Sequence, residues 1–172
     1  HNAREDKSFS YNSKTRMMFK NSLSLNDEEN LSLVKKKKYV VRLKVEADIE
    51  LRMTDLLRGD IKVNSNNLED KILIKGDGLP TYHFANVVDD YLMKITTIIR
   101  GEEWLPSLPI HKLIYDALGW EMPNTVHLPL ILNPSGLGKL SKRDAIRNNY
   151  SIFPIKWEEL DGLKEKGLPA EA

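Results

Sequence analysis

The residue types best suited to chemistry gather in residues 133–143, where two glycines are followed by three cations and a hydroxyl. Glycine gives such a loop mobility and lets its backbone approach a ligand closely. Lysine and arginine on a mobile loop suit a polyphosphate whose charge changes during a reaction. A solvated basic turn is the simpler explanation for the loop alone, because short basic runs are common. Two segments upstream shift the balance towards a binding site.

Polar side chains occur in both of these segments. Tyr82 and Asn86 lie in residues 82–88, a nearly continuous apolar run that is typical of a strand buried on both faces. Four residues apart on a strand, they would point to the same side. Arg100 ends a β-branched run at 95–100 and is followed by Gly-Glu-Glu-Trp. Together these groups could hold an amino acid beside a nucleotide.

Each of these side chains also has a structural explanation. Tyr82 could be a core tyrosine whose hydroxyl is satisfied locally, and Arg100 could form a surface ion pair that contributes little to stability. Trp104 is more often a packing residue than a base-stacking one. Asn86 is harder to explain in this way, because a buried amide needs hydrogen-bond partners.

The other acidic and histidine residues predict no metal site. His83, His111 and His127 are scattered and lack the spacing of metal ligands. The two aspartates at 89–90 could bind a metal, but a helix cap is the simpler account. The two glutamates at 102–103 could be acids in a first helical turn.

The elements that must position these residues differ between the two halves of the chain. In the first half, Ser24 or Asn26 can cap a helix that has an acidic first turn and ends at the lysines 35–38. A phosphate-binding role for those lysines is the less favoured reading. Alternating apolar and polar residues then predict an antiparallel module with strands at 39–45, 49–53, 56–63 and 71–75.

The second half predicts part of a parallel α/β sheet. The predicted strands are 82–88, 95–100 and 126–132, with a short helical turn at 91–93 capped by the aspartates before it. A helix begins near Ser107 and Pro109 and ends at Gly119. Ligands of open α/β sheets bind beyond the carboxyl ends of the strands. Arg100 and Lys142 both follow predicted strands, so we expect them to converge on one crevice.

Composition limits the function classes. With 172 residues, of which 41% are hydrophobic, the chain can form one packed domain or slightly more. The 26 basic and 25 acidic residues leave a net charge of +1, so nucleic-acid binding would have to be local. The absence of cysteine excludes disulfides and thiolate zinc sites, and it fits a reducing cytoplasm. No apolar run approaches the roughly 18 residues that a membrane helix needs.

Four segments read together resemble one family. Residues 78–90, 99–104, 127–132 and 139–143 are similar to the bacterial glutamyl-tRNA synthetases, which are class I aminoacyl-tRNA synthetases. The last segment resembles that family's KMSKS signature. The motifs occur in the family's order and spacing, and the resemblance is strong over about 39–144.

The resemblance implies an α/β fold, the C-terminal half of a class I synthetase Rossmann-like nucleotide-binding fold. Part of the inserted α+β connective domain, which binds the tRNA acceptor stem, would accompany it. Residues 1–77 would be this partial connective domain, whose basic residues would contact phosphates. Residues 78–145 would be the second half of the Rossmann-like catalytic domain with the KMSKS-like loop, and 146–172 the start of a stem-contact region.

The implied activity is glutamate–tRNA ligation. L-Glutamate would be activated by ATP to glutamyl-adenylate, with release of pyrophosphate, and then transferred to the 3′ terminal adenosine of tRNA(Glu). ATP would be a substrate accompanied by Mg²⁺, and no zinc is expected in this chain. The expected partners are tRNA(Glu), L-glutamate and ATP, and the expected protein is a cytoplasmic monomer that does not bind membranes.

The resemblance also implies roles for individual residues. Tyr82, Asn86 and Arg100 would lie at the glutamate site, where the forked guanidinium of Arg100 suits the two oxygens of a carboxylate. Glu103 and Trp104 would lie near ATP or the tRNA terminus.

The remaining roles belong to the last strand and the loop. Leu128 would meet the adenine region of ATP. Lys139 and Lys142 would be catalytic, neutralising charge on the departing pyrophosphate, and Lys142 is the stronger assignment. Lys142 would also contact ATP as the loop closes over it and reopens. The whole KMSKS-like motif is Lys139, Leu140, Ser141, Lys142 and Arg143.

Some family features are missing. No His-x-Gly-His (HIGH) signature occurs, Thr97 stands where the family often has histidine, and Ala145 replaces an expected glycine. Residues could be missing near 145 and 165. The chain is therefore expected to be a central fragment that is inactive alone; glutamate-dependent ATP–pyrophosphate exchange by the purified chain would contradict this. The alternatives are a glutamyl-queuosine tRNA synthetase and a non-catalytic RNA- or nucleotide-binding module.

Overall fold

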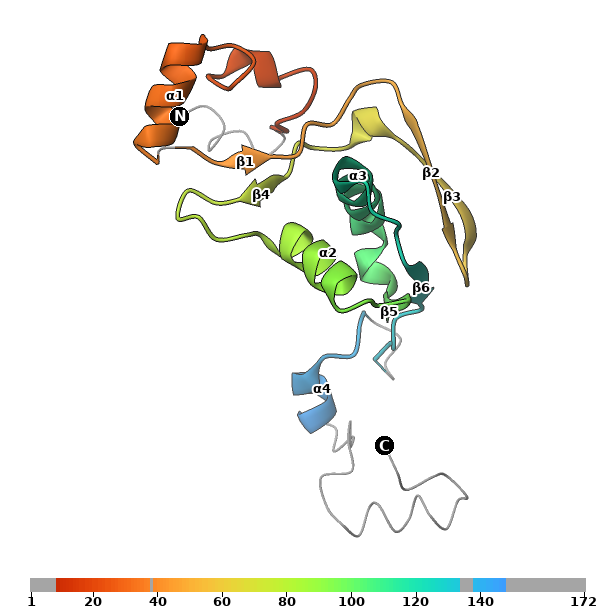
Figure 1. Cartoon of the computed structure of the whole chain (residues 1–172). Coiled ribbons are helices and arrows are strands. Elements are labelled where there is room, and N and C mark those ends of the chain that lie inside the picture. The colour runs from red at the N-terminus through yellow and green to blue at the C-terminus, as the bar shows by residue number, and fades with distance from the viewer. Residues whose placement is uncertain (1–8, 38, 134–137, 148–172) are drawn as a thin grey trace, which may run out of the picture. The chain divides into compact units, whose positions relative to one another are not determined.

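The computed structural model describes residues 9–37, 39–133 and 138–147 (Figure 1). They fall into two units, one that ends at Leu128 and one that begins at Pro129. The elements of the first unit are the 3₁₀ helix η2 (Arg16–Met18), α1 (Asp27–Lys35), β1 (Val41–Arg42), β2 (Glu50–Asp55), β3 (Gly59–Asn64), the 3₁₀ helix η3 (Ser65–Asn67), β4 (Ile72–Ile74), α2 (Tyr82–Leu92), β5 (Thr97–Gly101), the 3₁₀ helix η4 (Glu102–Ser107), α3 (Leu108–Leu118) and β6 (Asn124–Leu128). The second unit contains α4 (Lys142–Arg147).

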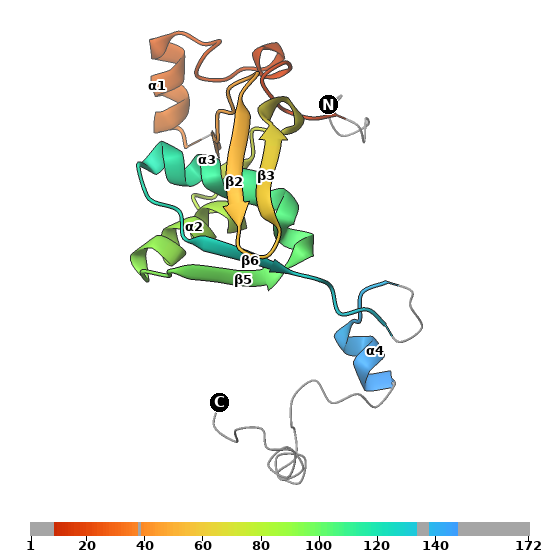
Figure 2. The same ribbon diagram turned by 90° about the vertical axis from the view of Figure 1, so that its right-hand side faces the viewer.

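A four-stranded mixed sheet organises the first unit, in the order β3-β2-β6-β5. β2 and β3 are antiparallel, whereas β5 and β6 are parallel in a register that places Arg100 opposite His127. The parallel pairing of Asp55 with Thr125 joins the two strand pairs. Figure 2 shows β2 and β3 standing at a steep angle to β5 and β6. This junction brings the end of β2 beside the beginning of β6.

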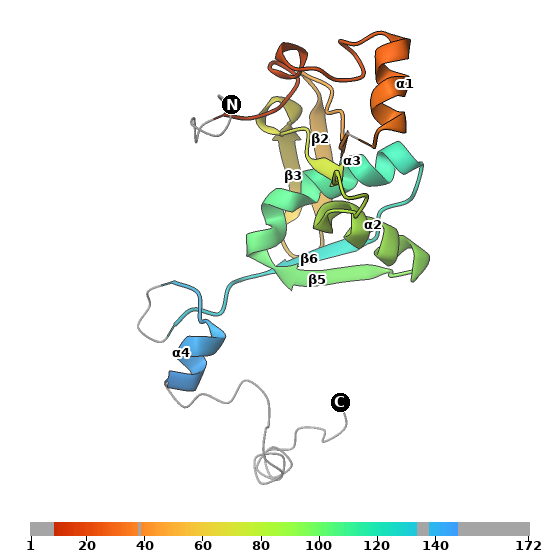
Figure 3. The same ribbon diagram turned by 90° about the vertical axis from the view of Figure 1, so that its left-hand side faces the viewer.

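Two helices cover one face of the β5–β6 pair. α2 and α3 lie next to each other there (Figure 3). α3 follows Ser107, whose side chain makes no capping bond, and it ends at Gly119 in the left-handed conformation with φ +68°. The main core cluster consists of Leu43, Val45, Val87, Ile110, Ile114 and Tyr115. A second cluster joins β2 to α3 through Leu51, Met53 and Leu108.

The predicted strand at 82–88 is wrong, because these residues begin α2. Its apolar residues Phe84, Val87, Val88 and Tyr91 recur at helical spacing, which the neighbouring apolar residues obscured. The aspartates at 89–90 accordingly lie inside α2 and cap no later turn. Residues four apart also share a face of a helix, so the expectation that Tyr82 and Asn86 point the same way survives the change of element.

The other predicted elements occur with shifted bounds. The predicted strand at 39–45 is reduced to the two residues of β1, which pairs antiparallel with β4. β6 ends at Leu128, four residues before the predicted end, where Pro129 lacks a backbone N–H for the ladder. The antiparallel β2–β3 pair and the parallel β5–β6 pair confirm the predicted strand directions. α1 begins after Asn26, one of the two predicted caps, and Asn26 forms a full capping box with Glu29.

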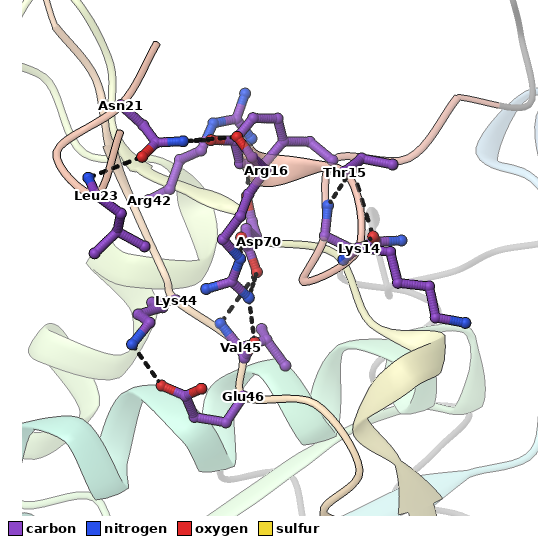
Figure 4. A network of polar contacts seen from close by, with 12 residues as sticks. Lys14, Thr15, Arg16, Asn21, Leu23, Arg42, Lys44, Val45, Glu46 and Asp70 are labelled. Atoms are coloured by element: carbon purple, nitrogen blue, oxygen red, sulfur yellow. Dashed lines mark hydrogen bonds and ion pairs between the residues drawn. The ribbon is translucent and has the colours of Figure 1, made fainter. Parts of the chain in front are cut away.

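A buried ion pair attaches the N-terminal segment to the unit. The guanidinium of Arg16 lies beside the carboxylate of Asp70, with Nε 3.1 Å from Oδ2, and also donates to the carbonyl of Val45 (Figure 4). Oδ1 of Asp70 accepts the backbone N–H of Val45 at 3.0 Å. Burial raises the pKa of Asp70, which these contacts oppose. Removing either charged partner would leave the other buried without compensation.

Every helix in the described ranges is too short or too polar to span a lipid bilayer. The assignment of 1–77, 78–145 and 146–172 to three regions stays a prediction, and most of the last region lies outside the described residues.

Candidate functional site

Arg100 is the centre of the polar cluster in the first unit. It is the fourth residue of β5, and its strand neighbour across the parallel ladder is His127 in β6. Nε of Arg100 donates a hydrogen bond to Nε2 of His127 at 2.9 Å. Because an arginine has no acceptor, the imidazole nitrogen must be unprotonated.

Asp55 determines which nitrogen of His127 carries the proton. Its Oδ2 lies 2.7 Å from Nδ1 of His127, and both side chains are fully buried. Burial pushes the pKa of Asp55 upward, but hydrogen bonds from His127 and from the backbone N–H groups of Arg58 and Leu57 outweigh it and hold the pKa at about 2. An ionised carboxylate only accepts, so Nδ1 of His127 is the donor.

Two further histidines extend this cluster from the helices: His111 contacts Arg100, and His83 contacts His111. Nδ1 of His111, in α3, lies 3.4 Å from Nη1 of Arg100, and its Nε2 lies 3.1 Å from Nδ1 of His83, in α2. Burial, the charge of Arg100 and the neighbouring imidazoles lower the pKa of His111 to about 3. Burial also lowers the pKa of His83. Both rings are therefore neutral near pH 7, and Arg100 supplies the positive charge.

Arg100 keeps one part of its guanidinium unpaired. Its Nη2 is buried and has no hydrogen-bond partner within the part of the chain that the structure describes. Oδ1 of Asn86, Oδ2 of Asp90 and the hydroxyl of Tyr115 are in the same situation. A buried, unpaired polar atom costs free energy. These orphaned atoms mark a place where a polar ligand would satisfy groups that the protein leaves open.

One stripe of α2 faces this cluster. Tyr82, Asn86 and Asp90 recur every four residues, so they share a helix face. Burial lowers the pKa of Arg100, and the neighbouring Tyr82 and Asp90 oppose that shift. Burial raises the pKa of Asp90, which Arg100 and Asn86 oppose. Tyr82 and Asn86, which we expected on one side of a strand, therefore lie on one side of a helix, and Asp90 shares that side with them.

An aromatic pair flanks the stripe. The ring of Tyr82 lies 4.8 Å from that of Trp104, between centroids, and 6.2 Å from that of His111. Half of Tyr82 is exposed and Trp104 is exposed to 36%. Trp104 belongs to η4, which starts directly after β5. The predicted glutamate-site residues and the predicted nucleotide-side tryptophan are therefore neighbours.

The ends of β5 and β6 carry the other predicted residues of this unit. Leu128 pairs with Gly101 and is 45% exposed. The carboxylate of Glu103 packs so closely on Gly101 that a Cβ there would meet Oε2 at 2.0 Å. Arg58 donates to the carbonyl of His127 at 3.1 Å and forms an ion pair with Glu102. Position 101 therefore requires glycine as long as the side chain of Glu103 keeps this conformation.

The KMSKS-like segment lies in the second unit, where Ser141 caps α4. Oγ of Ser141 accepts the backbone N–H of Asp144 at 3.1 Å and donates to Oδ2 of that residue at 2.6 Å. The hydrogen bonds from Ser141 lower the pKa of Asp144. Lys139 is exposed and forms a β-bridge with Leu132. The side chain of Lys142 lies outside the described residues, and the convergence of this segment with Arg100 stays a prediction.

Sequence reasoning missed the residues that surround Arg100. Asp55, His111 and His127 were not predicted as site residues, and Asp90 was interpreted as a helix cap. The available signal was a set of polar residues inside apolar segments, the same signal that distinguished Asn86. The described ranges hold no cluster of His, Asp or Glu side chains fit for a metal ion.

Comparisons with known proteins point to one family. The family model for the catalytic domain of class I tRNA synthetases (E and Q) matches residues 1–161. The glutamate–tRNA ligase of Cytophaga hutchinsonii is 51% identical over 172 residues, which cover 95% of this chain and 33% of that protein. The ligase of Christiangramia forsetii is 49% identical, covering 96% of this chain and 34% of its own length. The chain thus spans about a third of the length of these curated relatives.

A solved structure agrees with both relatives. The glutamate tRNA ligase from Elizabethkingia meningosepticum, crystallised in complex with its amino acid, is 51% identical and superposes with a TM-score of 0.80. The match covers 89% of this chain and 30% of that one.

Proposed function

We propose that this chain, which belongs to the catalytic-domain family of the class I tRNA synthetases for glutamate and glutamine, forms part of the active site of a glutamate–tRNA ligase. The reaction would join L-glutamate to ATP, release pyrophosphate and pass the glutamyl group to the 3′ terminal adenosine of tRNA(Glu). It would serve protein synthesis in the cytoplasm. The names of the relatives and the family model support this assignment.

The observation that carries the proposal is the open Nη2 of Arg100. A carboxylate is the acceptor that best fits a guanidinium edge, because two parallel hydrogen bonds form at once. Glutamate brings two carboxylates, and one of them would occupy this position. Asn86 and the hydroxyl of Tyr82 lie on the stripe of α2 that faces the guanidinium, and they would orient the amino acid.

The nucleotide would lie towards the ends of β5 and β6. Leu128 and Trp104 offer exposed apolar surface there, suited to the adenine ring or the terminal adenosine of the tRNA. Lys139 and Lys142 would neutralise the charge that grows on the departing pyrophosphate. Mg²⁺ would arrive with the ATP phosphates.

The test needs a complete enzyme, which a chimera supplies: this chain in place of the matching third of the Cytophaga hutchinsonii ligase. Arg100→Ala should raise the glutamate KM in ATP–pyrophosphate exchange by about 10- to 100-fold, the equivalent of one lost charge-assisted hydrogen bond. The KM for ATP should stay nearly constant. The control Arg52→Ala removes an exposed guanidinium from β2. Equal rises for both substrates would refute the glutamate role of Arg100.

A further inference from the structure

The guanidinium of Arg100 is held by imidazoles, although carboxylates are its usual partners. Its Nε donates to His127 and its Nη1 lies beside His111. Asp55 reaches it only through His127. A directly paired carboxylate would neutralise the guanidinium and compete with a substrate carboxylate. Neutral imidazoles fix its orientation without neutralising its charge, and Asp90 acts on that charge only electrostatically, because the two side chains form no hydrogen bond in the described ranges.

The proton positions follow from the chain of contacts. The carboxylate of Asp55 accepts from Nδ1 of His127, which leaves Nε2 as an acceptor for Arg100. Arg100 donates to Nδ1 of His111, so the proton of that ring is on Nε2 and points to Nδ1 of His83. All three rings are then neutral. His127 contacts Arg100 through Nε2, whereas His111 contacts it through Nδ1.

We propose that His127 and His111 are positioning residues that clamp the Arg100 guanidinium from two sides as neutral acceptors, so that its Nη2 stays directed at the substrate carboxylate. This inference rests on the proposed function, in which Arg100 binds glutamate. Asp55 and His83 act one step further out, by holding the rings in the required proton states.

The opposite use of the two ring nitrogens gives a crossed test. The amide of glutamine reaches the position of Nε2 of a histidine, whereas the shorter amide of asparagine reaches that of Nδ1. His127 contacts Arg100 through Nε2, so His127→Gln should keep the contact and His127→Asn should lose it. His111 contacts Arg100 through Nδ1, so His111→Asn should keep it and His111→Gln should lose it.

The readout is the glutamate KM of the chimera in ATP–pyrophosphate exchange. The two contact-losing variants should raise it by about tenfold, the order expected for one lost hydrogen bond to a charged group, while the contact-keeping variants stay within about threefold. The ATP KM should change little in all four. A purely structural role would give no crossed pattern, and equal effects of Asn and Gln at each site would overturn the proposal.

Two controls separate the possible failures. Arg100→Ala is measured in parallel: if it leaves the glutamate KM unchanged, the proposed function of Arg100 is wrong. If it raises the KM but the crossed pattern is missing, only the positioning role is wrong. Should the variants fail to fold, ¹⁵N spectra of the histidine rings in the unmodified chain still decide. The proposal requires the Nδ1–H form of His127 and the Nε2–H form of His111, and either opposite form would overturn it.

Discussion

Arg100 and His127 face each other across parallel strands, and the guanidinium donates to the imidazole at 2.9 Å. A histidine accepts a hydrogen bond from an arginine only when the ring is neutral and its proton is on the other nitrogen. The buried carboxylate of Asp55, 2.7 Å from that nitrogen, supplies this condition. The direction of one arginine in β5 thus depends on an aspartate at the end of β2.

Asp55→Asn should disturb the site without removing the side chain's volume. The amide oxygen can still accept the backbone N–H groups of Leu57 and Arg58, but an amide N–H facing His127 would force that ring into the other tautomer. Its proton would then point at Arg100. We expect a change in the ¹⁵N ring spectrum of His127 and, in the chimera, a glutamate KM that rises by about tenfold. Asp116→Asn, on the exposed face of α3, is the matched control; an unchanged His127 spectrum in Asp55→Asn would contradict the account.

The stability of the chain should fall in mild acid because of His111. Its pKa is lowered to about 3 in the folded state, so the unfolded state, with an ordinary pKa near 6.5, binds the extra proton first. Stability is therefore fully present above that unfolded pKa and is lost progressively as the pH falls from about 6.5 towards 3. Between pH 7.5 and 5.5 this single residue should contribute a loss of about 1 kcal/mol in the free energy of unfolding.

Urea unfolding at the two pH values measures this loss. His111→Asn removes the titrating group and should flatten the pH dependence by that amount. Glu121→Gln, an exposed change in the same unit, should leave it as it is. An equally steep dependence in His111→Asn would show that this ring titrates normally.

Gly101→Ala tests the close packing at the end of β5. The new Cβ would meet the carboxylate of Glu103, which lies at the end of a flexible side chain and can be displaced. We expect a loss of about 1 kcal/mol, at the low end for overpacking. The loss should disappear in the background of Glu103→Ala, because the clashing atoms are gone. Equal losses in both backgrounds, measured by urea unfolding, would place the constraint elsewhere.

Ser141→Ala should loosen α4 in the KMSKS-like segment. It removes the acceptor for the N–H of Asp144 and the donor to its carboxylate, at a cost of about 1 kcal/mol for a helix cap. Amide hydrogen exchange of residues 143–147 should become faster, whereas Ser141→Asp, which keeps an acceptor, should retain protection. Unchanged exchange in Ser141→Ala would mean that the cap contributes nothing to α4.

Sequence reasoning succeeded where the signal is local. The helix start near Asn26, the helix end at Gly119 and the alternation in β2 each follow from residues close together in the chain. It failed at residues 82–88, where continuous apolar residues fit a buried strand and a helix equally well. The spacing of Tyr82, Asn86 and Asp90 does not decide between a strand and a helix, because residues four apart lie on the same face of either element.

The surroundings of Arg100 depend on contacts between distant segments. Asp55 and His127 are 72 positions apart, and they meet because β2 pairs with β6 at Thr125. Nothing in the spacing of the three histidines predicts that they gather around one guanidinium. The sequence motif was enough to identify Arg100, whereas the residues that hold its guanidinium could be identified only from the fold.

The most direct test is the glutamate dependence of ATP–pyrophosphate exchange in the chimera with Arg100→Ala, beside Arg100→Lys. Both variants should raise the glutamate KM by about tenfold or more while the ATP KM stays nearly constant, because lysine keeps the charge but not the forked geometry. An unchanged glutamate KM in Arg100→Ala would contradict this expectation, since the open guanidinium edge would then have no part in binding the amino acid.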